Sequence, residues 1–274
     1  WEQDPDTLDT WFSSSLWTFS ALGWPLNAVE RASPQGGVSG SDLDIYHPTD
    51  VLETGYEILF FWVARMILMT GYVLGDIPFH TIYLHGTVRD NQGRKMSKSL
   101  GNGIDPIDIA EKFGSDAGRM TLIVGNTPGT DMRISEEKIK AYKHFANKMW
   151  NVARFVLENT KDFDRNEEPA LTPEDRKLLN DLDVLIKEIN GDMESYRFYL
   201  AAEKLYHYFW HTFADIIIEE SKKRISEGTP KEKQSAQLML FTILCTTIIL
   251  LHPFMPFITE ELWSMIKKDG SLLI

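Results

Sequence analysis

The most constraining feature of the sequence is a change of pattern near Ile134. From Ser135 onward, apolar residues recur every three or four positions, which is the spacing of one face of an α-helix. The first such stripe comprises Ile139, Tyr142, Phe145, Met149, Val152 and Val156. Further helices are predicted over about 174–190, 195–227, 231–251 and 258–268. Long helices joined by short links predict an α-helical bundle for residues 135–274.

The part of the chain before Ile134 has a different pattern. Residues 50–55 and 79–88 are predicted strands, and the strongly apolar segment 57–72 between them is a predicted helix. Two more helices are expected over 105–113 and 116–124. A strand–helix–strand order is typical of a parallel sheet, so the later half of a parallel α/β sheet is expected in residues 1–134. The predicted fold class is therefore α/β plus all-α.

The net charge of −12 bears on the choice of partner. RNA-binding surfaces need Lys and Arg to neutralise phosphates, yet the parts before and after residue 135 are both net acidic. Composition alone therefore disfavours nucleic acid as a partner. The best local basic strip lies on the first predicted bundle helix and comprises Lys138, Lys140, Lys143, Lys148 and Arg154. Its candidate RNA contacts are Lys143, Lys148 and Arg154. The alternative is that these side chains form an ordinary solvated helix face.

Metal sites and membrane spans are also disfavoured. Cys245 is the single cysteine and no Cys/His cluster has zinc spacing, so no protein-bound metal is predicted and a reducing, cytoplasmic compartment is expected. The longest apolar run, 238–251, has 14 residues, whereas a membrane span needs about 20. It is therefore interpreted as a buried bundle helix, with no membrane contact. The chain opens without a secretory signal or an initiator methionine, so we expect a piece of a longer protein.

The segment Gly93-Arg94-Lys95-Met96-Ser97-Lys98-Ser99-Leu100-Gly101-Asn102 is the strongest chemical motif. It sets two lysines three positions apart among small residues, with glycine on both sides. Such a loop presents two flexible ammonium charges and several hydroxyl and amide donors. It suits a polyanion whose charge changes during reaction, such as the triphosphate of ATP. The alternative interpretation is a solvated basic surface loop.

This segment resembles the KMSKS signature of class I aminoacyl-tRNA synthetases. Further segments resemble the valine-specific members of that class, in matching order: residues 8–17, 22–25, 53–66, 84–88, 145–148 and 252–257. The resemblance runs nearly end to end. It implies the second half of a Rossmann-like nucleotide-binding fold in residues 1–134 and an anticodon-binding bundle in 135–274. It also implies ATP-dependent activation of valine, with Mg²⁺ accompanying ATP as substrate, and transfer of the valyl group to tRNA(Val).

The resemblance assigns roles to individual residues. Lys95 and Lys98 would stabilise the departing pyrophosphate, which makes them the catalytic candidates. The valine pocket would be walled by Trp11, Ile58 and Trp62, the last two lying four apart on one helix face. The ATP-binding candidates are Gly55, Glu57, His85, Gly86, Met96, Ser97 and Ser99. The family commonly has aspartate where this chain has Glu57, beside the ATP ribose.

Several of these roles have a structural alternative. The pocket residues could be ordinary core residues, His85 a structural histidine and Met96 a loop anchor. Gly86 is expected to leave room for the adenine ring, because it ends a predicted parallel strand, where open α/β sheets bind ligands.

Parts of the class pattern are missing from the sequence. It contains no His-Ile-Gly-His-type motif and no editing domain, so we expect a C-terminal fragment that is inactive alone, from an enzyme that is monomeric when whole. An unpaired sheet edge would favour self-association of such a fragment. Two other classes of function stay open: a non-catalytic RNA-binding module, and a different nucleotidyltransferase.

Overall fold

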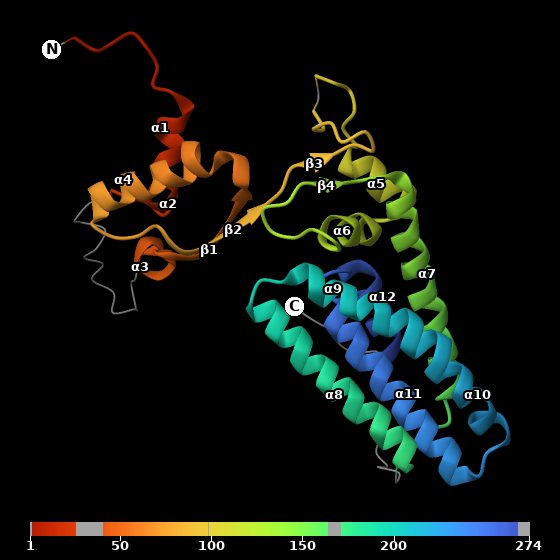
Figure 1. The fold of residues 1–274 in the computed structure, drawn as a ribbon. Helices are drawn as coiled ribbons and strands as arrows, with labels where there is room; N and C mark the ends of the chain where they lie inside the picture. The colour runs from red at the N-terminus through yellow and green to blue at the C-terminus, as the bar shows by residue number, and fades with distance from the viewer. Residues whose placement is uncertain (1, 26–40, 98, 164–170, 268–274) are drawn as a thin grey trace. The chain divides into compact units, whose positions relative to one another are not determined.

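The computed structural model describes residues 2–25, 41–97, 99–163 and 171–267. Contacts divide the chain into two units, which can be followed along the ribbon of Figure 1. The first unit comprises Trp1–Thr87 with Pro128–Asp131, and the second comprises Val88–Thr127 with Met132–Ile274. Residues 88–127 therefore group with the bundle, whereas the sequence pattern groups them with the part before it.

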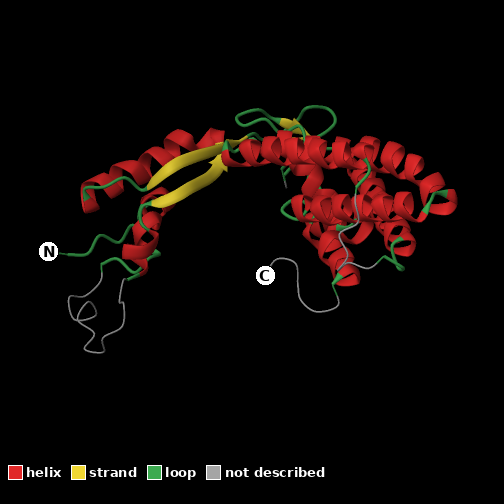
Figure 2. Cartoon of the chain, turned by 90° about the horizontal axis from the view of Figure 1, so that it is seen from below, coloured by secondary structure: helices red, strands yellow, loops and turns green. Residues whose placement is uncertain are grey.

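A two-stranded parallel sheet and its crossover form the centre of the first unit. β1 (Thr49–Gly55) pairs with β2 (Phe79–His85), and Gly55 lies opposite His85 at the carboxyl ends of both strands. The crossover consists of η1 (Tyr56–Ile58), η2 (Leu59–Val63) and α4 (Ala64–Leu74). Figure 2 shows the two strands as long yellow arrows beside this helical segment. The predicted strand–helix–strand order is confirmed, and short helices precede it: α1 (Thr10–Ser15), α2 (Trp17–Ser20) and α3 (Asp42–Tyr46).

The buried core of the first unit is small. One cluster comprises Leu52, Val63, Met66 and Phe79, and Phe19 is buried outside it. The crossover instead turns large apolar side chains outward: Phe60 is 76% exposed, Leu68 70% and Tyr72 88%. Soluble monomers rarely expose wide apolar patches, so self-association of the chain stays a prediction that this face supports.

Two described helices are long and apolar enough to cross a membrane, Tyr56–Leu74 and Pro230–Leu251. Length and composition are weak evidence, because the core helix of a soluble bundle meets the same criteria. In Pro230–Leu251, 56% of the apolar window is buried within the protein, as expected for the predicted bundle helix, against 17% in Tyr56–Leu74. The predicted absence of membrane contact remains a prediction.

The second unit begins with a short parallel pair and two helices, namely β3 (Val88–Arg89), β4 (Met132–Arg133), α5 (Pro106–Phe113) and α6 (Ser115–Ile123). The bundle follows as α7 (Glu136–Asn159), α8 (Pro173–Glu194), α9 (Phe198–His207), η3 (Tyr208–Ile217), α10 (Ile218–Glu227), α11 (Pro230–Leu251) and α12 (Pro256–Ile266). Hydroxyl side chains fix where three long helices begin. Ser135, Thr172 and Thr229 each accept a hydrogen bond from a backbone N–H in the first turn of α7, α8 and α11.

The predicted apolar stripe of α7 is confirmed as the centre of the bundle. All six of its residues are buried: Ile139, Tyr142, Phe145, Met149, Val152 and Val156. The ring of Phe145 lies 4.8 Å from that of Tyr206, 5.8 Å from that of Phe209 and 6.1 Å from that of Trp210, measured between centroids. Aromatic contacts between α7 and the α9–η3 segment therefore supply much of the packing in this core.

Polar contacts fasten α6 to the start of α12. Asp116 accepts hydrogen bonds from the backbone N–H groups of Phe257 and Ile258 at 3.3 and 2.7 Å. Arg119, one turn later, donates from Nε to the carbonyl oxygen of Phe254 at 3.1 Å. Burial raises the pKa of Asp116, while the two N–H donors act in the opposite direction. These contacts give the physical reason why residues 88–127 group with the bundle.

Candidate functional site

A tight hairpin carries the signature loop, which we define as residues 95–99. β3 runs into a turn in which Gly93 N–H donates to the carbonyl oxygen of Asp90 at 2.9 Å, and Gly93 adopts a φ of +80°. Only glycine takes that conformation without strain. The chain then returns antiparallel to β3, with Lys95 paired to Arg89. The first residue of the signature loop is therefore part of a hydrogen-bonded hairpin.

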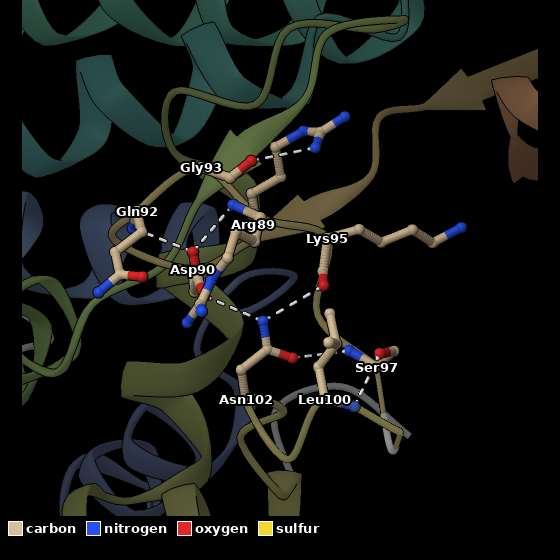
Figure 3. A network of polar contacts seen from close by, with 9 residues as sticks. Arg89, Asp90, Gln92, Gly93, Lys95, Ser97, Leu100 and Asn102 are labelled. Atoms are coloured by element: carbon tan, nitrogen blue, oxygen red, sulfur yellow. Dashed lines mark hydrogen bonds and ion pairs between the residues drawn. The ribbon is translucent and has the colours of Figure 1, made fainter.

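The carboxylate of Asp90 organises this turn, as Figure 3 shows. Its Oδ1 accepts from the backbone N–H groups of Gln92 and Arg94 at 3.0 and 2.9 Å, and its Oδ2 accepts from Nε of Arg94 at 2.9 Å. Asn102 adds a further hydrogen bond from Nδ2 to Oδ2, at 2.9 Å. The Asn102 hydrogen bond, with those from Arg94, lowers the pKa of Asp90 to about 2. Asp90 is therefore ionised at neutral pH.

The catalytic candidates differ in what the structure says of them. The side chain of Lys95 extends away from Asp90 and Asn102 and is exposed (Figure 3). Lys98, the second candidate, lies outside the described residues. Ser97 and Ser99 lie close together, with their Oγ atoms 3.1 Å apart, and Met96 packs partly buried against the core of the second unit. The hairpin therefore holds the base of the loop and directs at least Lys95 outward.

Three ATP-binding candidates gather at the carboxyl edge of the β1–β2 sheet. Gly55 and His85 are register partners there, and Glu57 follows directly in η1. The Glu57 carboxylate occupies the space beside Gly55, since a Cβ added at Gly55 would meet its Oε2 at 2.5 Å. The His85 ring bonds the Gly86 carbonyl through Nδ1 at 3.0 Å and lies 3.4 Å from a Glu53 carboxylate oxygen through Nε2. This edge is where open α/β sheets bind ligands.

Gly86 is required by the packing of the chain itself. A Cβ at this position would lie 1.8 Å from the carbonyl oxygen of Thr130 and 2.7 Å from the N atom of Asp131. Asp131 in turn accepts hydrogen bonds from Thr87 N–H at 2.8 Å and from the Tyr56 hydroxyl at 3.0 Å. The glycine thus admits residues 128–131 beside the end of β2, and its predicted adenine contact remains a proposal. The sequence carried no signal for this pairing.

Two of the valine-pocket candidates, Trp11 and Trp62, lie in aromatic ring pairs of the first unit. Trp11 of α1 lies 6.3 Å from Phe61, and Trp62 lies 6.3 Å from Trp17, between ring centroids. The indole N–H of Trp62 donates to the carbonyl oxygen of Ser14 at 3.2 Å, which ties the crossover to α1. Like Trp11 and Trp62, Ile58 is partly buried, at the end of η1. The structure thus places each tryptophan in a ring pair between the crossover and the short helices α1 and α2, and the contact of both with valine remains a proposal.

Two lysines of the predicted basic strip on α7 satisfy helix ends. Lys138 Nζ donates to the carbonyl oxygens of Thr121 and Val124, at 3.1 and 2.9 Å, where α6 ends. Lys143 Nζ donates to the carbonyl oxygen of Lys112 at 2.8 Å, in the last turn of α5. The last carbonyls of a helix lack partners within it and carry partial negative charge, so both contacts stabilise the packing of α7. Burial lowers the pKa of Lys138.

The other RNA-contact candidates differ in their surroundings. Lys148 forms an ion pair with Asp215 and lies 4.5 Å above the centroid of the Trp210 ring. Arg154 is exposed and makes no ion pair or hydrogen bond with any part of the chain that the structure describes. Arg154 is therefore better placed than Lys148 or Lys143 to meet a phosphate.

The described residues contain no group of three or more His, Cys, Asp or Glu side chains that could hold a metal ion.

Comparisons with known proteins agree with this architecture. A family model described as "tRNA synthetases class I (I, L, M and V)" matches residues 1–135, and one described as "Anticodon-binding domain of tRNA ligase" matches residues 175–274. The fold is similar to LeuRS of Agrobacterium radiobacter K84, solved as a ternary complex with tRNA and LeuAMS, with a TM-score of 0.75, 25% identity, and coverage of 98% of this chain and 33% of that chain. Methionyl-tRNA synthetase of Mycobacterium tuberculosis, solved with methionyl-adenylate, has the same fold, with a TM-score of 0.72, 22% identity, and coverage of 90% and 48%. The chain belongs to the class I aminoacyl-tRNA synthetases.

A curated relative narrows the placement within that class. The valine–tRNA ligase of Petrotoga mobilis is 46% identical over 277 residues, an alignment that covers 100% of this chain and 30% of that protein. Within the class, the chain is therefore similar to one part of the valine–tRNA ligases. It spans about 30% of the length of the curated relatives that it matches.

Proposed function

We propose that this chain carries the pyrophosphate-stabilising loop and the anticodon-binding bundle of an ATP-dependent valine–tRNA ligase. The observation that carries the proposal is the signature loop, held at its base by a hydrogen-bonded hairpin with Lys95 directed outward. ATP with Mg²⁺, valine and tRNA(Val) are the proposed substrates and partners. The cytoplasm is the proposed location, and the whole enzyme is proposed to be monomeric.

The proposed chemistry explains why a loop with two lysines is needed. A carboxylate oxygen of valine attacks the α-phosphorus of ATP, the bond from that phosphorus to the bridging oxygen of the β-phosphate breaks, and pyrophosphate leaves. Negative charge grows on the departing group in the transition state, so ammonium groups placed beside it lower the barrier. Lys95 and Lys98 supply that charge, and Ser97 and Ser99 offer hydroxyl donors beside them.

The first unit supplies the proposed sites for nucleoside and amino acid. Glu57 can accept hydrogen bonds from ribose hydroxyls, while Gly55 lets the backbone approach closely. His85 and Gly86 are the candidates in this unit that would border the adenine. Trp11, Ile58 and Trp62 wall an apolar slot for the valine side chain. A slot of this kind selects its ligand by size, so it cannot strongly reject an amino acid of nearly the same shape as valine that carries a hydroxyl group.

The chain by itself should bind pyrophosphate through the loop. Lys95→Ala removes one charge-assisted contact, so we expect about tenfold weaker pyrophosphate binding by calorimetry. Lys140→Ala, which removes the same charge from an exposed position on α7, is the matched control and should change nothing. Valine-dependent exchange of pyrophosphate into ATP should stay at background, because the sequence contains no His-Ile-Gly-His-type motif. Equal binding by both variants and the unaltered chain would contradict the proposed role of the loop.

Binding of tRNA tests the bundle separately. We expect the chain to bind tRNA(Val) more tightly than the same tRNA with a changed anticodon, and to keep that preference as salt rises. Arg154→Ala should reduce the slope of log affinity against log salt by about one, since one phosphate contact is lost. Arg176→Ala, at an exposed arginine of α8, is the control. If both tRNAs bind equally and the binding disappears as salt rises, the bundle only attracts phosphates and does not read the anticodon. If the chain binds tRNA but not pyrophosphate, a non-catalytic RNA-binding module is favoured.

A further inference from the structure

A single side chain closes the signature loop. Asn102 Oδ1 accepts a hydrogen bond from the backbone N–H of Ser97 at 3.0 Å. Its Nδ2 donates both to Oδ2 of Asp90 at 2.9 Å and to the carbonyl oxygen of Lys95 at 3.3 Å. One amide group therefore ties together the hairpin turn, the first residue of the loop and its third residue, as the dashed lines in Figure 3 show. We call this arrangement the Asp90–Asn102 clamp.

Apolar side chains around the base of the loop leave space between them. Two cavities of about 640 and 280 Å³ open there, and both are bordered by Met96, Ile104 and Ile134. Asp90 and Asn102 line the smaller one. Met96 packs partly buried against the core and also borders both cavities, so its apolar contacts alone leave the loop room to move. The directional hydrogen bonds of the clamp are then what set the path of the backbone from Lys95 to Ser97.

The chemistry of the clamp requires an amide at position 102. One of its contacts is a donor, Ser97 N–H, and the other two are acceptors, the Asp90 carboxylate and the Lys95 carbonyl. Only a side chain with both an acceptor and a donor group meets all three. A carboxylate of the same shape could still accept from Ser97 N–H, but it would face the Asp90 carboxylate. Repulsion between the two carboxylates would displace residue 102 and open the Ser97 contact more often. Among the charged side chains around the clamp, Arg94 is bonded to Asp90, Arg89 and Arg133 lie beside Gly93, and Glu136 lines the smaller cavity.

We propose that Asn102, through Asp90, is a positioning residue that holds the signature loop in the conformation able to receive the leaving pyrophosphate. The inference rests on the proposed function of the loop. Asn102 touches no substrate in this scheme and acts by fixing the backbone that carries Lys95 and Ser97. Loss of the clamp lowers the fraction of molecules with a competent loop, and the apparent affinity for pyrophosphate falls by the same factor.

Asn102→Asp in the full chain is the test, because it preserves shape and removes only the two donor contacts. At pH 8 we expect about tenfold weaker binding of inorganic pyrophosphate, as the competent fraction falls to about a tenth. Two carboxylates this close share a proton readily, so acidification restores a donor between them. The difference in pyrophosphate affinity between Asn102→Asp and the unaltered chain, measured at the same pH, should therefore become smaller toward pH 5. A merely structural defect would not recover on acidification.

Two further variants sharpen the test. Asn91→Asp makes the same chemical change in the same turn without touching a clamp contact, and it should bind pyrophosphate as the unaltered chain does. Asp90→Asn combined with Asn102→Asp exchanges the two groups, so an amide can again donate across the pair. The exchange should recover part of the affinity lost in Asn102→Asp, and this non-additivity measures the contact.

Hydrogen exchange at the Ser97 and Lys95 amides separates failure of the clamp from failure of the proposed function. If the unaltered chain binds no pyrophosphate, the function of the loop is wrong, and faster exchange at Ser97 in Asn102→Asp still supports the clamp. If Asn102→Asp binds pyrophosphate normally at pH 8, or if Ser97 exchanges at the same rate in both proteins, the clamp does not position the loop and the inference is overturned.

Discussion

Asp175→Ala is expected to lower the free energy of unfolding of the second unit by about 3 kcal/mol, because it breaks a buried ion pair and leaves one partner behind. Asp175 is fully buried at the start of α8. Its Oδ2 accepts a hydrogen bond from Nη1 of Arg224 at 2.8 Å and another from the Ser235 hydroxyl at 2.6 Å. The carboxylate thus joins α8 to α10 and α11. Urea denaturation followed by circular dichroism measures the loss.

The matched control is Asp183→Ala, which removes an exposed carboxylate from the same helix and should change stability by less than about 0.5 kcal/mol. Equal stability of the two variants would show that the network around Asp175 contributes nothing. If the free energy of unfolding falls in Asp175→Ala but not in Asp183→Ala, the buried network around Asp175 stabilises the fold.

The dependence on pH distinguishes this carboxylate from an apolar core residue. Burial by itself would raise the pKa of Asp175, yet the hydrogen bonds from Arg224 and Ser235 outweigh burial and hold the pKa below its usual value of 3.8. A depressed pKa stabilises the folded protein at pH values above the unfolded pKa, and that contribution is lost as the pH falls through the folded pKa. The difference in stability between the unaltered chain and Asp175→Ala should therefore narrow below about pH 4.

Gly86→Ala is expected to destabilise the first unit by about 3 kcal/mol, at the upper end for overpacking, because backbone rather than a mobile side chain blocks the new methyl group. The added carbon would lie 1.8 Å from the Thr130 carbonyl oxygen. Residues 128–131 must then move away from β2, which breaks the bond from Gly129 N–H to the Leu84 carbonyl oxygen, 2.8 Å long. Amide hydrogen exchange in β1 and β2 should become about a hundredfold faster.

Gly71→Ala serves as the control in the same unit. Gly71 lies within α4, and a Cβ there would meet nothing within 4 Å. Alanine is the better helix former, so this variant should be neutral or more stable by up to about 1 kcal/mol. If Gly86→Ala exchanged as slowly as Gly71→Ala, residues 128–131 would not lie against Gly86 in solution.

Features that follow from the spacing of apolar residues along the chain could be predicted from the sequence. The spacing of Ile139, Tyr142 and Phe145 defines a buried face whatever that face packs against, and the three residues are buried as expected. The strands around residues 49–55 and 79–85 were likewise marked by their composition. In these cases the burial of a residue follows from its neighbours along the chain.

Features that depend on distant partners could not be predicted in this way. Lysines 138 and 143 looked like a solvated basic strip, because nothing near them in sequence shows that α6 and α5 end beside α7. Gly86 was interpreted through its place at the end of a strand, while its need for glycine comes from Thr130, 44 positions later. The hydrogen bonds from Asn102 to Asp90 and to the Lys95 carbonyl could not be predicted either.

The bond between Asp116 and Ile258 joins residues 142 positions apart, and that between Arg119 and Phe254 spans 135. Closing so long a loop lowers the conformational entropy of the chain before either contact can stabilise it. This unfavourable step slows folding. During synthesis, α6 can pack against α7 soon after both leave the ribosome, but its contacts with α12 have to wait while about 140 residues follow. The face of α6 that meets α12 is therefore among the last parts of the second unit to reach its final packing, and an incomplete chain would expose that face to chaperones and proteases.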